Sequence, residues 1–360
     1  MFRYKIRKAQ EEASAIAQKA QEYLETSSYW EYEKSLGNGS YGVAILVRQK
    51  GESAPNKRRM ALKIALKGLE SDLETEINWL KELHGAKHIV QMLEYVDNQV
   101  RSNMDEGPQS LSEQTIFSSL ARIEGPLLAL EYIDGGDMLQ FWERMWEDDV
   151  HMPNRMLWAL YLCLIRACIG MAYPIGSAVG TAPVLETMPP DGTTLRGIKH
   201  NDIATRNVMI NTGDGLGEHH IGHMFKLIDF GVTTEDTVKP EVGPQKNLFE
   251  ISQYVGFFIK MANLRTGRLR VHKGFETRAT ELLEESWGRS YPWLDRDLAE
   301  LIAECMYYDA ARRPSLQEAL TRAGDAVMNR RANSFPEPQN ETDDAIREFV
   351  QRYILDASTG

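Results

Sequence analysis

Three oxygen-bearing side chains follow one another in the second half of the sequence, and their types suit phosphate chemistry. Asp202 stands five residues before Asn207, and Asp229 opens the triplet Asp229-Phe230-Gly231. Phosphoryl transfer needs a carboxylate that accepts the proton of the attacking hydroxyl and oxygen ligands that hold Mg²⁺ on the phosphates. We therefore predict that Asp202 is the base and that Asn207 and Asp229 are metal ligands.

A glycine-rich run lies much nearer the N-terminus. Gly37, Gly39 and Gly42 form a G-x-G-x-x-G pattern. The same spacing opens dinucleotide-binding folds, but there a helix follows, whereas a strand-like segment follows here. This context favours a glycine-rich hairpin loop whose backbone N–H groups lie over phosphate oxygens. A tight hairpin that only needs positive φ at its glycines is the alternative.

A lysine interrupts the next apolar, strand-like segment. Lys63 follows Ala61-Leu62, and Glu76 lies in the helix-like segment after it. A carboxylate there can hold the ammonium group against the α- and β-phosphates of a nucleotide. Glu74 is a competing partner, but Glu76 is better placed against the apolar face. A solvated lysine at a sheet edge is the alternative interpretation.

The secondary structure that must position these residues differs between the first and the second part of the chain. Hydrophobic spacing and turn residues predict helices over 5–24, 69–83, 138–146 and 157–171, a mostly helical region from 247 to about 326, and a final helix over 344–355. Strands are predicted over 44–47, 60–64, 90–96, 127–133, 208–210 and 225–228. The stretches 97–119 and 173–196 have no periodicity and are predicted to be insertions.

This order of elements predicts an α+β protein with two lobes. A β-rich first part, about 30–133, is followed by the hinge-like Gly135-Gly136 and by a larger helical part, about 134–325. Residues 1–29 are predicted to be an N-terminal helical extension, and residues 326–360 a C-terminal tail.

Composition restricts the partners of the protein. The formal net charge of -11 disfavours nucleic acid and anionic membrane as partners, because both would repel an acidic chain. Three scattered cysteines do not suggest a disulfide framework, and no Cys-x-x-Cys spacing indicates zinc. No segment approaches the roughly 18 uninterrupted apolar residues that a membrane span needs. We expect a soluble, intracellular protein, most simply a cytoplasmic one.

Taken together, these motifs resemble the protein kinase superfamily over roughly residues 30–325. The matching elements follow the family's order: the glycine-rich loop, Lys63, Glu76, the hinge-like 130–138, the loop His200 to Asn207, Asp229-Phe230-Gly231, and Arg312-Arg313-Pro314. Each motif alone is weak, but their ordered combination is specific. The resemblance implies a two-lobed fold with a small β-rich N-lobe and a larger helical C-lobe, and it implies ATP and Mg²⁺ as cofactors.

The resemblance also implies a role for individual residues. Lys63 would contact the α- and β-phosphates and pair with Glu76, Asp202 would be the catalytic base, and Arg206 would lie beside the transferring phosphate. The predicted nucleotide contacts, beyond the glycines and Lys63, are Leu130 as gatekeeper, the backbone of Glu131 and Ile133 on adenine, Asp137 on the ribose, and Ala44, Ala61 and Met209 around the base.

Two departures from the family pattern concern regulation and substrate. Asn201 occupies the place of an arginine that in the family pairs with a phosphorylated loop, so activation by that route is not expected. The segment after Gly231 is short and offers only Lys239-Pro240-Glu241 in place of Ala-Pro-Glu, with Glu241 a candidate partner of Arg313. Ala204 and Arg206 resemble the catalytic loop of tyrosine kinases.

The leading hypothesis is therefore a protein kinase that transfers the γ-phosphoryl group of ATP to a protein hydroxyl. A small-molecule kinase of similar fold is an alternative, which the short segment favours. A pseudokinase that acts as a binding or scaffold module is the third possibility, although the predicted catalytic residues are all present.

Overall fold

A computed structural model describes residues 2–38, 42–51, 58–97, 116–120, 122–213, 217–220, 223–283 and 291–356. The protein is α+β, as predicted. Its first part contains a five-stranded antiparallel sheet in the order β1-β2-β3-β5-β4. The strands are β1 (Trp30–Asn38), β2 (Gly42–Gln49), β3 (Arg59–Ala65), β4 (Met92–Val96) and β5 (Leu127–Glu131).

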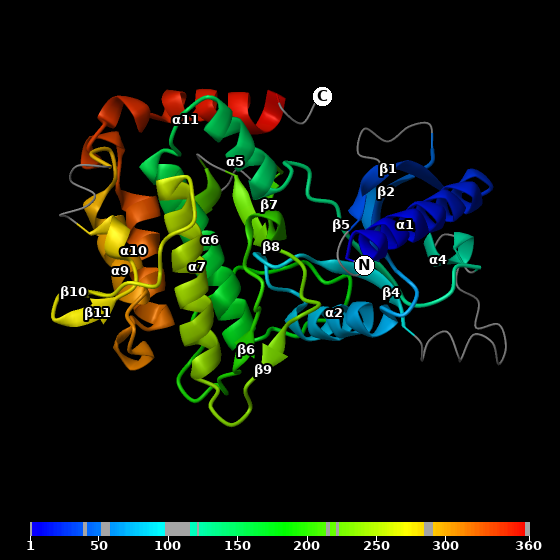
Figure 1. Ribbon diagram of the computed structural model, residues 1–360, viewed down its shortest axis with the longest axis horizontal. Helices are drawn as coiled ribbons and strands as arrows, with labels where there is room; N and C mark the ends of the chain where they lie inside the picture. The colour runs from blue at the N-terminus through cyan, green and yellow to red at the C-terminus, as the bar shows by residue number, and fades with distance from the viewer. Residues whose placement is uncertain are drawn as a thin grey trace.

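The two faces of this sheet are covered by different elements, because successive side chains of a strand point to opposite faces. Met60, Leu62 and Ile64 of β3 belong to a core cluster that includes α1 (Phe2–Glu25). On the opposite face, Leu128 and Leu130 of β5 join the core around α2 (Glu70–Leu83). Figure 1 shows α1 lying along the sheet and α2 at its other side.

The N-terminal helix packs on the sheet rather than projecting from it. Ala13, Ala20 and Leu24 are buried against the strands. The backbone N–H of Lys67, in the turn before α2, donates to Glu12 Oε1 over 2.8 Å. The predicted extension therefore contributes one layer of the N-terminal core.

The second part is mostly helical (Figure 1). Its helices are α5 (Met138–Glu147), α6 (Asn154–Ala172), α7 (Val242–Lys260), α9 (Arg296–Cys305), α10 (Leu316–Asn329) and α11 (Asp343–Val350). Within the described residues, α6 alone is long and apolar enough to cross a membrane, but 94% of its apolar window is buried inside the protein. Apolar side chains surround α6 because α7, α10 and β8 (Met224–Leu227) pack around it.

The prediction of a mostly helical region from 247 to about 326 missed one stretch of β-structure. Residues Arg270–His272 and Phe275–Thr277 form the antiparallel hairpin β10–β11. Lys273 and Gly274 both have positive φ, 48° and 86°, which is the turn geometry that suits a two-residue hairpin. The helix α7 also begins at Val242, five residues before the predicted start.

The predicted insertion at 173–196 is an irregular but packed strap. Lys87 N–H donates to the Val184 carbonyl over 3.1 Å, and Val184 N–H donates to the Gly85 carbonyl over 2.8 Å. These bonds tie the strap to the loop between α2 and β4. Of the other predicted insertion, 97–119, only Asp97 and the short helix α4 (Ile116–Ser119) fall within the described residues.

Two small ladders carry the loops of interest. β7 (Val208–Asn211) pairs with β8, and β6 (Ile198–Lys199) pairs with β9 (Thr234–Glu235), both antiparallel. They bring the segments around Asp202, Asp229 and the residues after Gly231 next to one another.

Candidate active site

Lys63 and Glu76 meet on the face of the sheet that α2 covers. Lys63 lies on β3 opposite Ala44 of β2 and Leu128 of β5, which therefore share its face. Its Nζ is 2.6 Å from Glu76 Oε1 and 2.8 Å from Oε2. The predicted pair is thus formed by Glu76 and not by Glu74.

A second carboxylate approaches the same ammonium group. Asp229 Oδ1 lies 3.8 Å from Lys63 Nζ. Burial alone would lower the pKa of Lys63, but the charges of Glu76 and Asp229 outweigh burial and raise it. Burial raises the pKa of Glu76, and the Lys63 charge opposes this shift. Lys63 is therefore a fixed cation beside two carboxyl groups.

Asp202, Arg206 and Asn207 form a second group. The loop 202–207 closes through the 3-10 turn Thr205–Asn207, so that Asn207 Nδ2 donates to the Asp202 carbonyl and to Asp202 Oδ2, both over 2.8 Å. Arg206 Nη2 lies 2.7 Å from Asp202 Oδ2. The structure therefore brings the predicted base, the predicted phosphate-side arginine and one predicted metal ligand together.

The ladder β7–β8 connects this group to Asp229. Ile228 N–H donates to the Asn207 carbonyl over 2.9 Å, which places Asp229 next to Asn207. Asp229 itself has a φ of 68°, in the left-handed region that non-glycine residues rarely adopt. Residues in this region are enriched at functional sites, although they also occur in turns and at helix ends.

His200 forms hydrogen bonds with backbone groups next to both sets of residues. Its Nδ1 accepts a bond from Asp202 N–H over 3.2 Å, so its Nε2 carries the proton and donates to the Ile228 carbonyl over 3.1 Å. The ring packs edge-on against Phe230, with centroids 4.8 Å apart. Burial lowers the pKa of His200 to about 4, which keeps the imidazole neutral at pH 7.

Asn247 is a positioning residue that the sequence analysis did not identify. It is completely buried on α7. Its Oδ1 accepts from His200 N–H over 3.2 Å, and its Nδ2 donates to the Ile198 carbonyl over 2.8 Å. Asn247 therefore anchors the start of the loop that carries Asp202.

The hinge segment lies where the sheet meets the helical part. Gly135 N–H donates to the Ile210 carbonyl over 2.8 Å, and Ile210 N–H donates to the Gly136 carbonyl over 2.9 Å. A Cβ at Gly135 would lie 2.5 Å from the Ile210 carbonyl oxygen, so this close approach requires glycine. The hinge is therefore fixed to β7.

Several predicted nucleotide contacts flank this hinge. Leu130 lies opposite Ala61 in the β3–β5 ladder, and Met209 lies opposite Asp137 in an isolated bridge. Asp137 Oδ1 caps α5 by accepting from Gln140 N–H over 2.9 Å. The Glu131 side chain pairs with Lys226, and Ile133 is buried in the same core as Leu130.

The glycine-rich run is described only at its two ends. Gly37 has a φ of 136° and lies opposite Ala44 in the β1–β2 ladder. A Cβ at Gly42 would lie 2.5 Å from the Ile64 carbonyl oxygen. The hairpin is thus confirmed, and glycine is required at both ends. Gly39 lies outside the described residues.

Asn201 is tied to the segment after Gly231 by neutral hydrogen bonds. Asn201 Nδ2 donates to the Val232 carbonyl over 3.0 Å and to Thr234 Oγ1 over 2.9 Å, while Lys246 Nζ donates to Asn201 Oδ1. Asn201 has a φ of 67°. The segment is therefore held without a phosphate group.

Arg313 does not contact Glu241, contrary to the suggested pairing. Its guanidinium donates to the Tyr307 carbonyl over 3.0 Å and to the Gln245 carbonyl over 2.8 Å, and it lies over the Phe249 ring. Glu241 is exposed just before α7. Arg313 thus stabilises the backbone of α7 directly.

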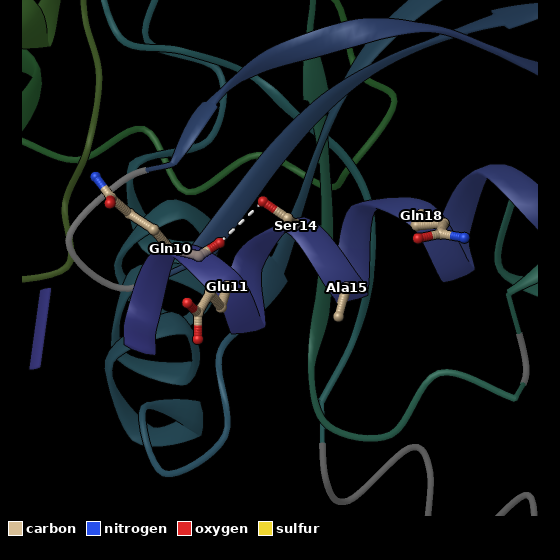
Figure 2. Close-up of a pocket in the computed structure, with 5 residues that line it drawn as sticks. All are labelled: Gln10, Glu11, Ser14, Ala15 and Gln18. Atoms are coloured by element: carbon tan, nitrogen blue, oxygen red, sulfur yellow. Dashed lines mark hydrogen bonds between the residues drawn. The ribbon is translucent and has the colours of Figure 1, made fainter. Parts of the chain in front are cut away.

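A hollow on the outer face of α1 is unrelated to these residues. Figure 2 shows that it is lined by Gln10, Glu11, Ser14, Ala15 and Gln18, all from one helix. Ser14 Oγ donates to the Gln10 carbonyl over 2.9 Å, which is an ordinary bond within a helix. The lining includes none of the predicted site residues.

Comparisons with known proteins add no family assignment. A scan against protein-family models finds no match, and a search of curated proteins finds none either.

Proposed function

We propose that this chain is an ATP- and Mg²⁺-dependent phosphotransferase with a two-lobed, protein-kinase-like fold. The observation that carries the proposal is the ion pair between Lys63 and Glu76, 2.6 Å long, with Asp229 3.8 Å from the same ammonium group. A lysine fixed in this way can bind the α- and β-phosphates of a nucleotide while the carboxylate beside it binds their metal ion.

The residues proposed to hold Mg²⁺ fit that ion. Mg²⁺ prefers oxygen ligands, and Asp229 supplies a carboxylate. Asn207 uses its amide nitrogen for both bonds to Asp202, so its amide oxygen remains to accept a metal. When bound, the ion would neutralise charge that develops on the phosphate oxygens.

Asp202 is proposed to accept the proton of the attacking hydroxyl. Its Oδ2 receives bonds from Arg206 and Asn207, which fix the direction of the carboxylate. Arg206 would stabilise negative charge on the transferring phosphoryl group, since a guanidinium is a strong partner for phosphate oxygens. In this scheme the hydroxyl oxygen attacks the γ-phosphorus, its proton passes to Asp202, and ADP leaves.

The acceptor is proposed to be a protein hydroxyl. The short segment between Gly231 and α7 leaves little chain to grip a peptide, which favours a small-molecule hydroxyl as the second candidate. A pseudokinase is disfavoured because the groups around Lys63 and Asp202 are assembled. The acidic net charge disfavours nucleic acid and anionic membrane as partners, and the three free cysteines suit a reducing, intracellular location.

The test is transfer of label from γ-labelled ATP, with Mg²⁺, to a panel of proteins, peptides and small alcohols. We expect Glu76→Gln to lose transfer and Glu74→Gln, the neighbouring carboxylate on α2, to retain it. Asp229→Ala should abolish the Mg²⁺-dependent part of ATP binding in a thermal-shift titration. The proposed site would be refuted if ATP bound equally well with and without Mg²⁺ and if Asp229→Ala bound ATP as the wild type does.

A further inference from the structure

A buried polar cluster lies apart from the residues used above, between three segments that are distant in the sequence. His88 lies in the loop between α2 and β4, Cys163 on α6, and His219 in the 3-10 turn Gly217–His219. All three side chains are buried, and their potential ligand atoms lie within 4.8 Å of one another. Cys163 Sγ is 3.8 Å from His219 Nδ1.

We propose that His88, Cys163 and His219 bind a Zn²⁺ ion. Two imidazoles and one thiolate are a donor set that suits zinc. Zinc bonds of about 2.0 to 2.3 Å in a tetrahedron require donors roughly 3.3 to 3.6 Å apart, so the side chains need only a small contraction around the ion.

The orientation of His88 points to a metal more strongly than the residue types do. His88 Nδ1 lies 2.7 Å from Glu186 Oε2, and His88 N–H donates to Glu186 Oε1 over 2.7 Å. The carboxylate holds the Nδ1 proton, so the lone pair of Nε2 faces the cluster. Among the described residues, this fully buried Nε2 has no hydrogen-bond partner. A carboxylate behind a ligand histidine is the usual outer shell of a zinc site.

The charges around the cluster also favour a cation. Glu218 Oε1 lies 3.8 Å from His88 Nε2 and 3.7 Å from His219 Nε2, so it is a further oxygen donor close to both rings. Arg166 pairs with Glu218 at 2.6 Å. With neutral imidazoles, Glu186, Glu218 and Arg166 leave one negative charge uncompensated. A dication that displaces the thiol proton of Cys163 adds one positive charge and neutralises the cluster.

The absence of a Cys-x-x-Cys motif did not exclude this site, because its ligands come from three separate segments. The bound ion would join the strap 173–196, through Glu186, to α6 and to the loop before β4. This is the arrangement of a structural zinc site, in which binding free energy adds to folding free energy. The inference does not depend on the proposed phosphotransferase activity.

The experiment uses the full chain, stripped with a chelator and then given Zn²⁺ or Co²⁺. We expect one zinc per chain after desalting, measured by mass spectrometry of the metal, and a higher melting temperature than without metal. Co²⁺ should give tetrahedral d–d bands and a thiolate-to-cobalt charge-transfer band. Wild-type protein that retains neither metal would overturn the proposal and would favour an imidazolium at His88 between the two carboxylates.

Substitutions distinguish the loss of zinc binding from a general loss of core packing. Cys163→Ser should abolish the charge-transfer band, while Cys168→Ser, a buried thiol on the same helix, should keep it. Glu186→Gln should weaken zinc binding about 10- to 100-fold, as loss of an outer-shell carboxylate does. A charge-transfer band unchanged in Cys163→Ser would also overturn the assignment.

Discussion

The indole Nε1 of Trp79 donates a 3.0 Å hydrogen bond to the backbone carbonyl of Thr233. Trp79 lies on α2, three residues after Glu76, and Thr233 lies two residues after Gly231. This bond fixes the helix that carries the lysine partner to the segment that follows Asp229. The position of α2 and the conformation of that segment are therefore coupled.

We expect Trp79→Phe to lower phosphotransferase turnover several-fold, because an aromatic ring remains on α2 but the bond to Thr233 is lost. The free energy of unfolding should fall by about 1 kcal/mol, the usual net value of one hydrogen bond. Steady-state kinetics and urea denaturation would measure both. Trp146→Phe, at an exposed tryptophan of α5, is the matched control. Equal turnover in the two variants would show that the coupling has no functional role.

Asp202→Asn should reduce turnover about a hundredfold or more while ATP affinity stays nearly constant, because a positioned base acts mainly in the transition state. The amide keeps the size of the side chain and removes its capacity to take a proton. Single-turnover transfer and a thermal-shift titration with ATP would separate the two effects. Turnover close to that of the wild type would mean that Asp202 is not the base.

Activity should not depend on phosphorylation of Thr233, Thr234 or Thr237. A phosphate orders a loop chiefly by pairing with cations, whereas Asn201 already holds Thr234 and the Val232 carbonyl by neutral bonds. Thr233 is also buried, with no room to hydrate a phosphate. Phosphatase-treated protein and the triple alanine variant should match untreated protein in the transfer assay. A large loss in both, with the fold intact, would contradict this prediction.

Stability should fall as pH drops from about 6.5 to about 4, in part because of His200. Burial holds the pKa of His200 near 4, below its ordinary 6.5, so the unfolded chain binds the extra proton in this window. The contribution is present above pH 6.5, is lost towards pH 4, and amounts to about 3 kcal/mol at most. Urea denaturation of His200→Gln at pH 7 and pH 4.5 should show a smaller pH-dependent change than the wild type. An identical change would refute the assignment.

Glu341→Ala should lower the free energy of unfolding by about 3 kcal/mol, because charge-assisted bonds to buried donors are lost. Glu341 is buried, and its carboxylate accepts from the backbone N–H of Asn154 over 2.6 Å and of Arg155 over 3.0 Å. These two N–H groups lie in the first turn of α6, where they have no acceptor within the helix, and the N-cap residue Pro153 provides no side-chain bond to them. Glu348→Ala, at an exposed glutamate of α11, should change stability little. Thermal denaturation of the two variants provides the comparison.

The parts of the site that sequence could predict are those encoded by residue type and short spacing. Lys63, Glu76, Asp202, Asn207 and Asp229 each lie in a short motif, and the order of these motifs marked them as candidates. The structure brings them into two adjoining groups. The strands and helices around them were also predictable, because each buries one face with a regular period.

The parts that sequence could not predict depend on contacts between distant segments. Asn247 and Glu341 accept hydrogen bonds from backbone groups 47 and 187 residues earlier in the chain, and nothing near either residue indicates that partner. The hairpin β10–β11 was missed because its strands are only three residues long, too short for an alternating pattern to be distinguished from a helix. The sequence did not indicate that His88 and His219 lie next to Cys163, because only the fold brings these three segments together.

The capping of α6 by Glu341 has a consequence for how the chain is made. The carboxylate lies 187 residues after the helix N-terminus that it completes. At roughly 5 to 20 residues per second, the ribosome needs on the order of ten to forty seconds to add that stretch. During this interval α6, the one described helix long and apolar enough to cross a membrane, has emerged with its first turn uncapped. Chaperone binding to nascent chains should therefore peak after α6 emerges and decline only once the last helix has been released.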